Sequence, residues 1–308
     1  MTAGSAGRQG DPRTTARLMR LAAYASVATA TILIVVKVVA WWLTDSVSLL
    51  SSLIDSLLDA MASVIMLLAV RAALTPADDE HRFGHGKAEA LAALAQAALI
   101  TGSAIFLVAE AAHRLAVPQP IAYGDIGIAV MAFSIVLTFA LTRVQAYVVR
   151  HTQSLAIEAD SIHYLSDLLM NSAVILALVL VTYLGWQLAD PVIAIAIAAY
   201  ILVSALRIGW KAYNMLMDRE LPAEEQERIR EIVQAHGDVR GLHDLRTRRA
   251  GPQVFIQLHI EMDGGMSLYR AHAVADAVEA DLQTAFPGAE VIIHQDPSLL
   301  EEERTGFA

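Results

Sequence analysis

The chain has 308 residues, of which 56% are hydrophobic and 18% are charged, and its formal net charge at pH 7 is −10. Soluble globular domains are about 45–50% apolar and about 25% charged, so this composition argues against an ordinary soluble enzyme and against a disordered or collagen-like chain. The excess of acidic over basic residues disfavours nucleic-acid binding. The absence of cysteine excludes a disulfide framework, a cysteine-ligated zinc site and a thiol nucleophile.

The charge is distributed unevenly along the chain. The last part, Asp218–Ala308, contains 18 acidic and 9 basic residues, whereas the preceding part contains 14 acidic and 13 basic residues. This asymmetry predicts a long, nearly neutral membrane domain followed by an acidic soluble domain. We expect four regions: a disordered N-terminal segment at 1–17, a membrane domain at 18–217, a soluble domain at 218–300 and a tail at 301–308.

Six hydrophobic segments follow the polar N-terminus, and each is long enough for a bilayer core, which needs about 20 helical residues. None shows the alternation of a transmembrane β-strand, so they predict an α-helical membrane protein with six transmembrane helices. Lysine and arginine gather at one set of helix ends, which places those ends and both termini in the cytoplasm. The segments are Leu18–Leu43, Ser46–Leu74, Ala88–Val117, Ile126–Val149, Ser154–Tyr183 and Pro191–Met217.

The acidic part predicts a small α+β domain with the element order α-β-β-α-β. Its helices show amphipathic patterns with start and stop signals, and its strands show alternation of apolar residues. The expected elements are a helix at Pro222–His236, strands at His243–Arg249 and Gln253–Met262, a helix at Ser267–Phe286 and a strand at Val291–His294.

Two of the predicted spans carry pairs of ionisable residues four positions apart. Asp55 and Asp59 lie in the second span, and His163 and Asp167 lie in the fifth. Residues at i and i+4 lie on one face of a helix, and a carboxylate near the middle of a span costs about 2.5–3.5 kcal/mol on insertion scales. If the two faces meet, they offer three oxygen donors and one nitrogen donor, a set that tetrahedral Zn²⁺ accepts. A structural polar cluster is the alternative, and a proton relay is compatible with metal binding because bound metal displaces protons.

A lysine also lies within a predicted span. Lys37 is about one helical turn from Trp41 and Trp42, which mark the outer interface of the first helix. We interpret Lys37 as a lysine that snorkels to this interface, with a role in transport as the alternative.

Two further clusters outside the spans have metal-ligating residue types. The loop after the second span contains Asp78, His81 and His85, which could close on one divalent ion, and a solvated loop is the alternative. The acidic domain holds five of the ten histidines, with His294 followed by Asp296 at the end of the last expected strand. In a domain without cysteine these residues suggest oxygen and nitrogen metal sites, with ordinary surface histidines as the alternative.

In the segments that contain these clusters, the chain resembles the cation diffusion facilitator family, and in particular its bacterial zinc and ferrous-iron efflux transporters. The resemblance extends from about Arg17 to Pro297. The segments that carry it are WWLTDSVSLLSSLIDSLLD, PADDEHRFGHGKAEALAALAQ, ADSIHYLSDLLMN, DLRTR and VIIHQDP.

The resemblance implies a role for each cluster. It implies a transport site at Asp55, Asp59, His163 and Asp167, and a loop site at Asp78, His81 and His85. It implies a binuclear cytoplasmic site at His243, His259, His272, His294 and Asp296, in which Asp296 bridges. It also implies a charge pair between Lys87 and Asp218 that joins the two domains.

The family resemblance further implies what the protein does and where it lies. It implies a homodimer in the bacterial inner membrane with a metallochaperone-like cytoplasmic domain. Such a protein would be a secondary active transporter that exports Zn²⁺, or Cd²⁺ or Fe²⁺, in exchange for protons. It would have no organic cofactor, and Zn²⁺ would be both the substrate and a regulatory ligand.

Two other classes of function are weaker. An intramembrane metalloenzyme would need an open coordination position for water, which four protein ligands do not leave, and the sequence has no His-Glu-x-x-His run. A proton-coupled exporter of organic cations would need a roomy aromatic cavity, whereas only 6% of the residues are aromatic.

Overall fold

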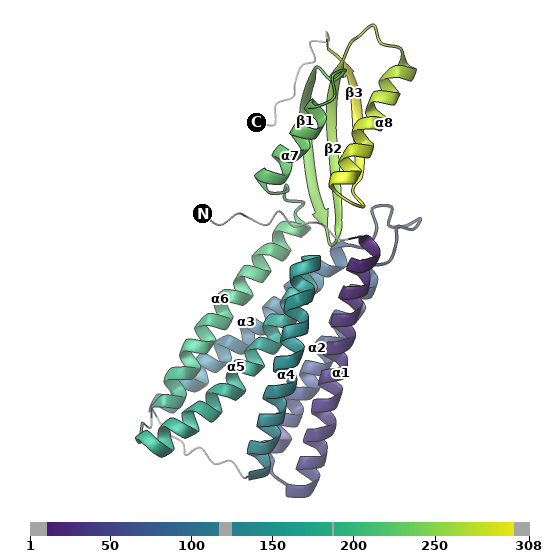
Figure 1. Cartoon of the computed structure of the whole chain (residues 1–308). Coiled ribbons are helices and arrows are strands. Elements are labelled where there is room, and N and C mark those ends of the chain that lie inside the picture. Colours follow the sequence, from purple (N-terminus) through teal and green to yellow (C-terminus); the bar gives the residue numbers. More distant parts are fainter. Residues whose placement is uncertain (1–10, 117–124, 187, 299–308) are drawn as a thin grey trace. The chain divides into compact units, whose positions relative to one another are not determined.

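The computed structural model describes residues 11–116, 125–186 and 188–298 (Figure 1). The described residues divide into two compact units: one is Arg13–Asn214, and the other contains residues 215–298 together with residues 11 and 12. The predicted tail at 301–308 and residues 1–10 of the predicted N-terminal segment lie outside the described residues.

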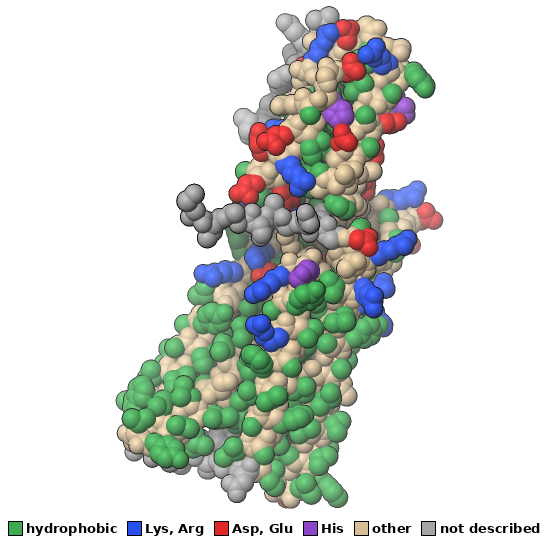
Figure 2. All heavy atoms as spheres, viewed as in Figure 1, with side chains coloured by type: hydrophobic (Ala, Val, Ile, Leu, Met, Phe, Trp, Pro, Cys, Tyr) green, Lys and Arg blue, Asp and Glu red, His purple; other side chains and the backbone are tan. Residues whose placement is uncertain are grey.

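The first unit is built of six long helices, each long and apolar enough to cross a membrane. Hydrophobic side chains are spread over the visible surface of this unit (Figure 2), as expected for helices that face lipid. The prediction of six transmembrane helices is therefore confirmed. The helices are α1 (Pro12–Thr44), α2 (Val47–Ala73), α3 (Lys87–Ala116), α4 (Asp125–Thr152), α5 (Leu155–Leu184) and α6 (Ala189–Leu216).

The first helix begins earlier than the hydrophobic pattern predicts. Residues 12–17, which we expected to be disordered, form the first turns of α1. Pro12 stands at the first helical position, where its fixed φ is favourable and its missing N–H costs no helical hydrogen bond. Asp11 precedes it, and aspartate is a preferred residue at a helix start. The polar residues therefore extend the apolar helix, and the predicted disorder of residues 12–17 is wrong.

Helix α5 packs against α2, α3 and α4. Small residues on α5, among them Ala156, Ala159, Ala173 and Ala177, are buried and let neighbouring backbones approach closely. Because α5 carries one of the two ionisable pairs and α2 carries the other, this packing brings the two pairs to one helix interface.

The second unit is an α+β domain with the predicted order of elements. Its elements are α7 (Ala223–Gln234), β1 (Gly241–Ala250), β2 (Gln253–Met262), α8 (Leu268–Ala285) and β3 (Glu290–Pro297). The strands lie in the order β1-β2-β3, with β1 antiparallel and β3 parallel to the central strand. The expected α-β-β-α-β fold is confirmed, and β3 extends three residues beyond the predicted strand.

The core of this domain lies between one face of the sheet and the two helices. Val254, Ile256, Leu258 and Ile260 alternate along β2, and all are buried with residues of α7 and α8. Side chains at the odd-numbered positions of β2 point to the other face, because successive side chains of a strand alternate. His259 therefore lies on the face of the sheet that the helices do not cover.

Candidate metal centres

The first candidate centre lies between α2 and α5. His163 Nε2 is 3.1 Å from Asp59 Oδ1 and 3.9 Å from Asp167 Oδ2. One ligand atom from each of these three residues lies within 4.8 Å of the others, and all three are partly buried. Asp55 is exposed and falls outside this group, although it interacts electrostatically with Asp59. The structure therefore brings three of the four expected ligands together. The fourth, Asp55, lies about one helical turn before Asp59 on α2.

A buried carboxylate fixes the start of α5, the helix that carries His163 and Asp167. Glu89 of α3 is 1% exposed. Its Oε1 accepts hydrogen bonds from the Ser154 hydroxyl and, at 3.1 Å, from the Ala156 backbone N–H. The first N–H groups of a helix lack intrahelical acceptors and favour a nearby negative charge. Glu89 therefore ties the first turn of α5 to α3.

A second buried polar cluster, not anticipated from the sequence, joins α1, α4 and α5. Asp160 is fully buried, and its Oδ2 accepts from Ser26 Oγ at 2.5 Å and from Gln145 Nε2 at 2.7 Å. An acidic residue inside a membrane span indicates a functional or structural polar site. The position of Asp160 in the fifth predicted span was therefore a signal for this cluster in the sequence. Next to it, the hydroxyl groups of Tyr164 and Ser63 lie 2.7 Å apart and link α5 to α2.

Lys37 does not fit the snorkelling interpretation. Its Nζ donates to the Ser52 carbonyl at 3.0 Å and to Ser56 Oγ at 2.6 Å, both on α2. Ser56 is 2% exposed. The ammonium group is therefore held against the helix that carries Asp55 and Asp59.

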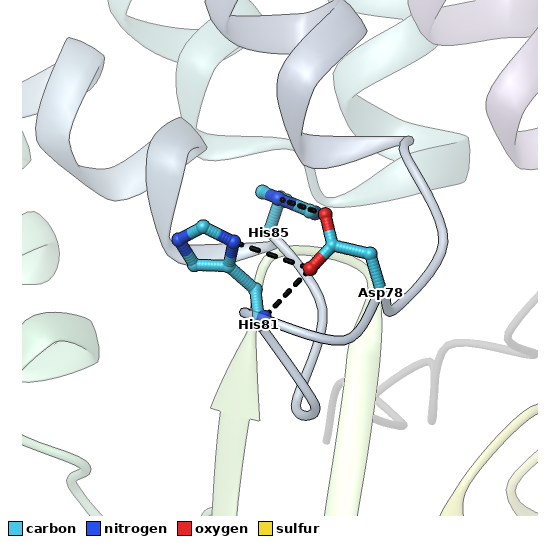
Figure 3. Close-up of side chains that lie close together, drawn as sticks. All are labelled: Asp78, His81 and His85. Atoms are coloured by element: carbon cyan, nitrogen blue, oxygen red, sulfur yellow. Dashed lines mark hydrogen bonds and ion pairs between the residues drawn. The ribbon is translucent and has the colours of Figure 1, made fainter.

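The second candidate centre is the loop between α2 and α3 (Figure 3). Asp78 Oδ1 lies 3.3 Å from His81 Nδ1, and Asp78 Oδ2 lies 3.4 Å from His85 Nε2. The hydrogen bond from the His81 backbone N–H, with the nearby His85 and the Glu80 backbone N–H, lowers the pKa of Asp78. The carboxylate therefore stays ionised, which is the form that binds metal, to a lower pH than an ordinary aspartate.

The third candidate centre lies on the open face of the sheet in the second unit. The register pairs His243 with His259 and His259 with His294, so the three imidazoles form a row across all three strands. The buried Asp296 lies at their centre: its Oδ2 is 2.9 Å from His259 Nδ1 and 3.4 Å from His243 Nε2. Its other oxygen, Oδ1, is 3.1 Å from His294 Nε2. One carboxylate thus contacts three imidazoles through both oxygens, and the bridging role of Asp296 stays a prediction.

Three further expected site residues lie elsewhere. His272 is on α8, where its Nε2 is 3.5 Å from Asp276 Oδ2, and it is outside the group formed by His243, His259 and Asp296. Lys87 is the first residue of α3 in the first unit. Asp218 belongs to the second unit, where its Oδ1 lies 3.2 Å from Arg248 Nη1. The pair between Lys87 and Asp218 stays a prediction.

Comparison with known proteins identifies the family. The family profile described as the cation efflux transmembrane domain matches residues 23–217, which is more than half of the chain. The chain belongs to the cation efflux family. A second profile, the cytoplasmic domain of cation efflux proteins, matches residues 221–298. The predicted membership of the cation diffusion facilitator family is therefore confirmed, and this member is an efflux transporter rather than an enzyme.

Similar proteins cover nearly the whole chain. The cation-efflux pump FieF of Klebsiella pneumoniae subsp. pneumoniae is 51% identical over 282 residues, which is 92% of this chain and 94% of the relative. FieF of Escherichia coli O1:K1 / APEC is 50% identical over 281 residues, 91% of this chain and 93% of the relative. Among solved structures, the metal-bound C-terminal domain of the CzcD transporter from Thermotoga maritima is 28% identical with a TM-score of 0.25, and it covers 27% of this chain and 100% of the domain.

Proposed function

We propose that this cation efflux transporter is an antiporter that exports Zn²⁺ from the cytoplasm in exchange for protons. The observation that carries the proposal is the convergence of Asp59, His163 and Asp167 between α2 and α5, with Asp55 one turn away. Oxygen and imidazole ligands suit Zn²⁺, and they also suit Fe²⁺ and Cd²⁺ as further substrates. The absence of cysteine argues against Cu⁺.

The proposed cycle uses the same residues for metal and protons. Zn²⁺ reaches the site from the cytoplasm, and the three aspartates and neutral His163 bind it. The ligands lose their protons when the metal binds, because only the deprotonated forms coordinate. After the helices rock to the outward-open state, protonation of the site weakens metal binding and releases Zn²⁺. His163 is the proposed proton carrier, because imidazole is the side chain whose ordinary pKa lies near neutral.

The proposed location is the bacterial inner membrane, with both termini in the cytoplasm. Arginines stand at the ends of helices that would face inward, such as Arg71 in the last turn of α2 and Arg150 in the last turn of α4. Positively charged residues favour the cytoplasmic side. In this orientation the loop that contains Asp78 and the domain that contains Asp296 both face the cytoplasm.

The first test measures proton movement. Purified protein in proteoliposomes with a pH-sensitive dye inside is exposed to Zn²⁺, Cd²⁺, Fe²⁺, Mn²⁺ or an organic cation. We expect Zn²⁺ to drive proton counterflow, and we expect His163→Ala to move fewer protons per metal ion because one proton carrier is lost. An unchanged proton-to-metal ratio in His163→Ala would contradict the role of His163. Competition by an organic cation would instead favour that class of substrate.

For the cytoplasmic domain we propose a metal sensor that stabilises a homodimer. The row of His243, His259 and His294 around Asp296 would bind two metal ions, with Asp296 as the bridge and His272 as a further ligand. Metal binding would neutralise part of the strong negative charge of this domain and so reduce the repulsion between two copies. We also propose a metal site in the loop at Asp78, His81 and His85. In the same proposal, a charge pair between Lys87 and Asp218 joins the two domains.

A double variant separates sensing from transport. We expect His259→Ala with Asp296→Ala to keep metal binding at the transmembrane site and measurable transport. The dependence of the transport rate on cytoplasmic metal should become weaker, because the sensor has lost its bridging carboxylate. The measurement is the transport rate as a function of Zn²⁺ concentration. Loss of Zn²⁺ binding at the transmembrane site in this variant would contradict the separation of the two functions.

A further inference from the structure

The membrane unit holds a positive charge beside the transmembrane metal site. The ammonium group of Lys37 on α1 donates to the Ser52 carbonyl and to the buried hydroxyl of Ser56 on α2. These two residues flank Asp55 in sequence, and Asp59 follows Ser56 by less than one helical turn. The ammonium group of Lys37 thus lies against α2, the helix that supplies half of the proposed ligands, although an ammonium group cannot itself coordinate a metal ion.

The charges around Lys37 come from both ligand-bearing helices. Lys37 interacts electrostatically with Asp59 and Asp55 of α2 and with Asp167 of α5. His163 is the remaining ionisable ligand, and it is neutral when it coordinates metal. Asp160 lies three residues before His163, but its Oδ2 is engaged by Ser26 and Gln145 in the separate cluster described above. The local group therefore consists of three carboxylates and one ammonium.

The sum of these charges equals the charge that one divalent cation neutralises. When metal is bound, the three carboxylates are ionised and carry three negative charges, since ligands coordinate in the deprotonated form. Lys37 reduces the net charge to minus two, which one divalent cation neutralises. Without Lys37 the occupied site would keep an uncompensated negative charge inside the membrane, where charge is costly.

We propose that Lys37 sets the net charge of the transmembrane site to that of a divalent cation and thereby limits how tightly the site holds the metal ion. The inference rests on the proposed function, because it takes the site of Asp55, Asp59, His163 and Asp167 as the transport site. When the site holds no metal, the positive charge of Lys37 partly neutralises the carboxylates. When metal is bound, the same charge repels the metal ion. It therefore weakens metal binding and speeds metal release, which a transporter needs and a storage protein does not.

The test replaces the charge and follows binding and transport separately. The full-length background carries Asp78→Ala, His259→Ala and Asp296→Ala, so that Zn²⁺ binding reports the transmembrane site. In this background we compare Lys37→Gln, Lys37→Met and Lys37→Arg at one fixed pH. Lys211→Gln is the matched control, because it removes the charge of a largely exposed lysine whose Nζ pairs with Glu158 Oε1 at 2.6 Å. Equilibrium dialysis with Zn²⁺ gives Kd, and uptake into proteoliposomes gives KM and kcat.

Removal of the charge should tighten binding and slow turnover together. For Lys37→Gln and Lys37→Met we expect Kd and KM for Zn²⁺ to fall by roughly tenfold or more, because a unit charge close to a divalent ion in a poorly screened site is removed. We expect kcat to fall, because release becomes slower. Lys37→Arg, which keeps the charge, and Lys211→Gln should both match the background protein. A purely structural role for Lys37 would raise Kd instead.

The outcomes separate this inference from the proposed function. If the background protein binds and transports Zn²⁺ but both charge-removing variants bind it equally well or more weakly, the inference about Lys37 is wrong and the transport site stands. If Lys37→Arg behaves like Lys37→Gln, charge is not the property that matters, and the inference is also wrong. If the background protein neither binds nor transports Zn²⁺ while the unmodified chain binds it only in the cytoplasmic domain, the proposed function fails and the inference fails with it.

Discussion

Replacing Asp59 by asparagine should lower the affinity of the transmembrane site for Zn²⁺ by about 100-fold. Even residues that only orient metal ligands change metal affinity by about 10- to 100-fold, and Asp59 is a proposed ligand in its own right. Its Oδ1 lies 3.1 Å from His163 Nε2, so the substitution removes a negative charge at the centre of the group. The measurement is equilibrium Zn²⁺ binding in the background that lacks the loop and cytoplasmic sites.

Asp45 offers a matched control for this loss of charge. It stands between α1 and α2 with φ of 49°, a left-handed conformation that asparagine also tolerates. Asp45→Asn removes one negative charge outside the ligand group and should leave Kd unchanged. Equal effects of Asp59→Asn and Asp45→Asn would mean that general electrostatics, rather than coordination, governs binding.

A second large effect is expected at Glu89, which is not itself a proposed ligand. Glu89→Ala should lower the free energy of unfolding by about 2–4 kcal/mol, because the Ser154 hydroxyl and the Ala156 N–H lose their buried acceptor. The loss falls on the first turn of α5, so transport should fall as well. The measurement is the shift in the temperature at which half of the protein loses its folded, monodisperse form.

Glu158 is the control for this prediction, since it is also a glutamate in the first turn of α5. Its carboxylate forms an ion pair with Lys211 in which both side chains are partly or largely exposed. Exposed ion pairs contribute about 0–1 kcal/mol, so Glu158→Ala should shift the unfolding temperature much less. A shift for Glu158→Ala as large as that for Glu89→Ala would contradict the role of Glu89 in holding α5.

The sequence predicted the helices and strands because these follow from local patterns. The lengths of the apolar runs defined six spans, and alternation along β2 defined its buried and open faces. The spacing of Asp55 with Asp59 and of His163 with Asp167 also placed each pair on one helix face. These properties depend on residues close together in the chain, so periodicity alone reveals them.

Properties that depend on distant partners could not be predicted in the same way. The alignment of His243, His259 and His294 in one row depends on the register of three strands, which no single strand specifies. The Lys37 side chain turns toward α2 because its hydrogen-bond acceptors lie there. Asp160 is buried in part because Gln145 of α4 packs against it. The early start of α1 is a different case, because Pro12 is a local signal for a helix start that the pattern of apolar residues does not contain.

We propose that the site between α2 and α5 exchanges divalent metal for protons. The most direct measurement is Zn²⁺ flux into proteoliposomes under an imposed pH gradient, with the unmodified protein compared with Asp167→Ala. We predict that the unmodified protein moves Zn²⁺ with proton counterflow and that Asp167→Ala, although folded, does not. Equal Zn²⁺ flux by both proteins, or no flux by either while Zn²⁺ still binds to the cytoplasmic domain, would contradict the account.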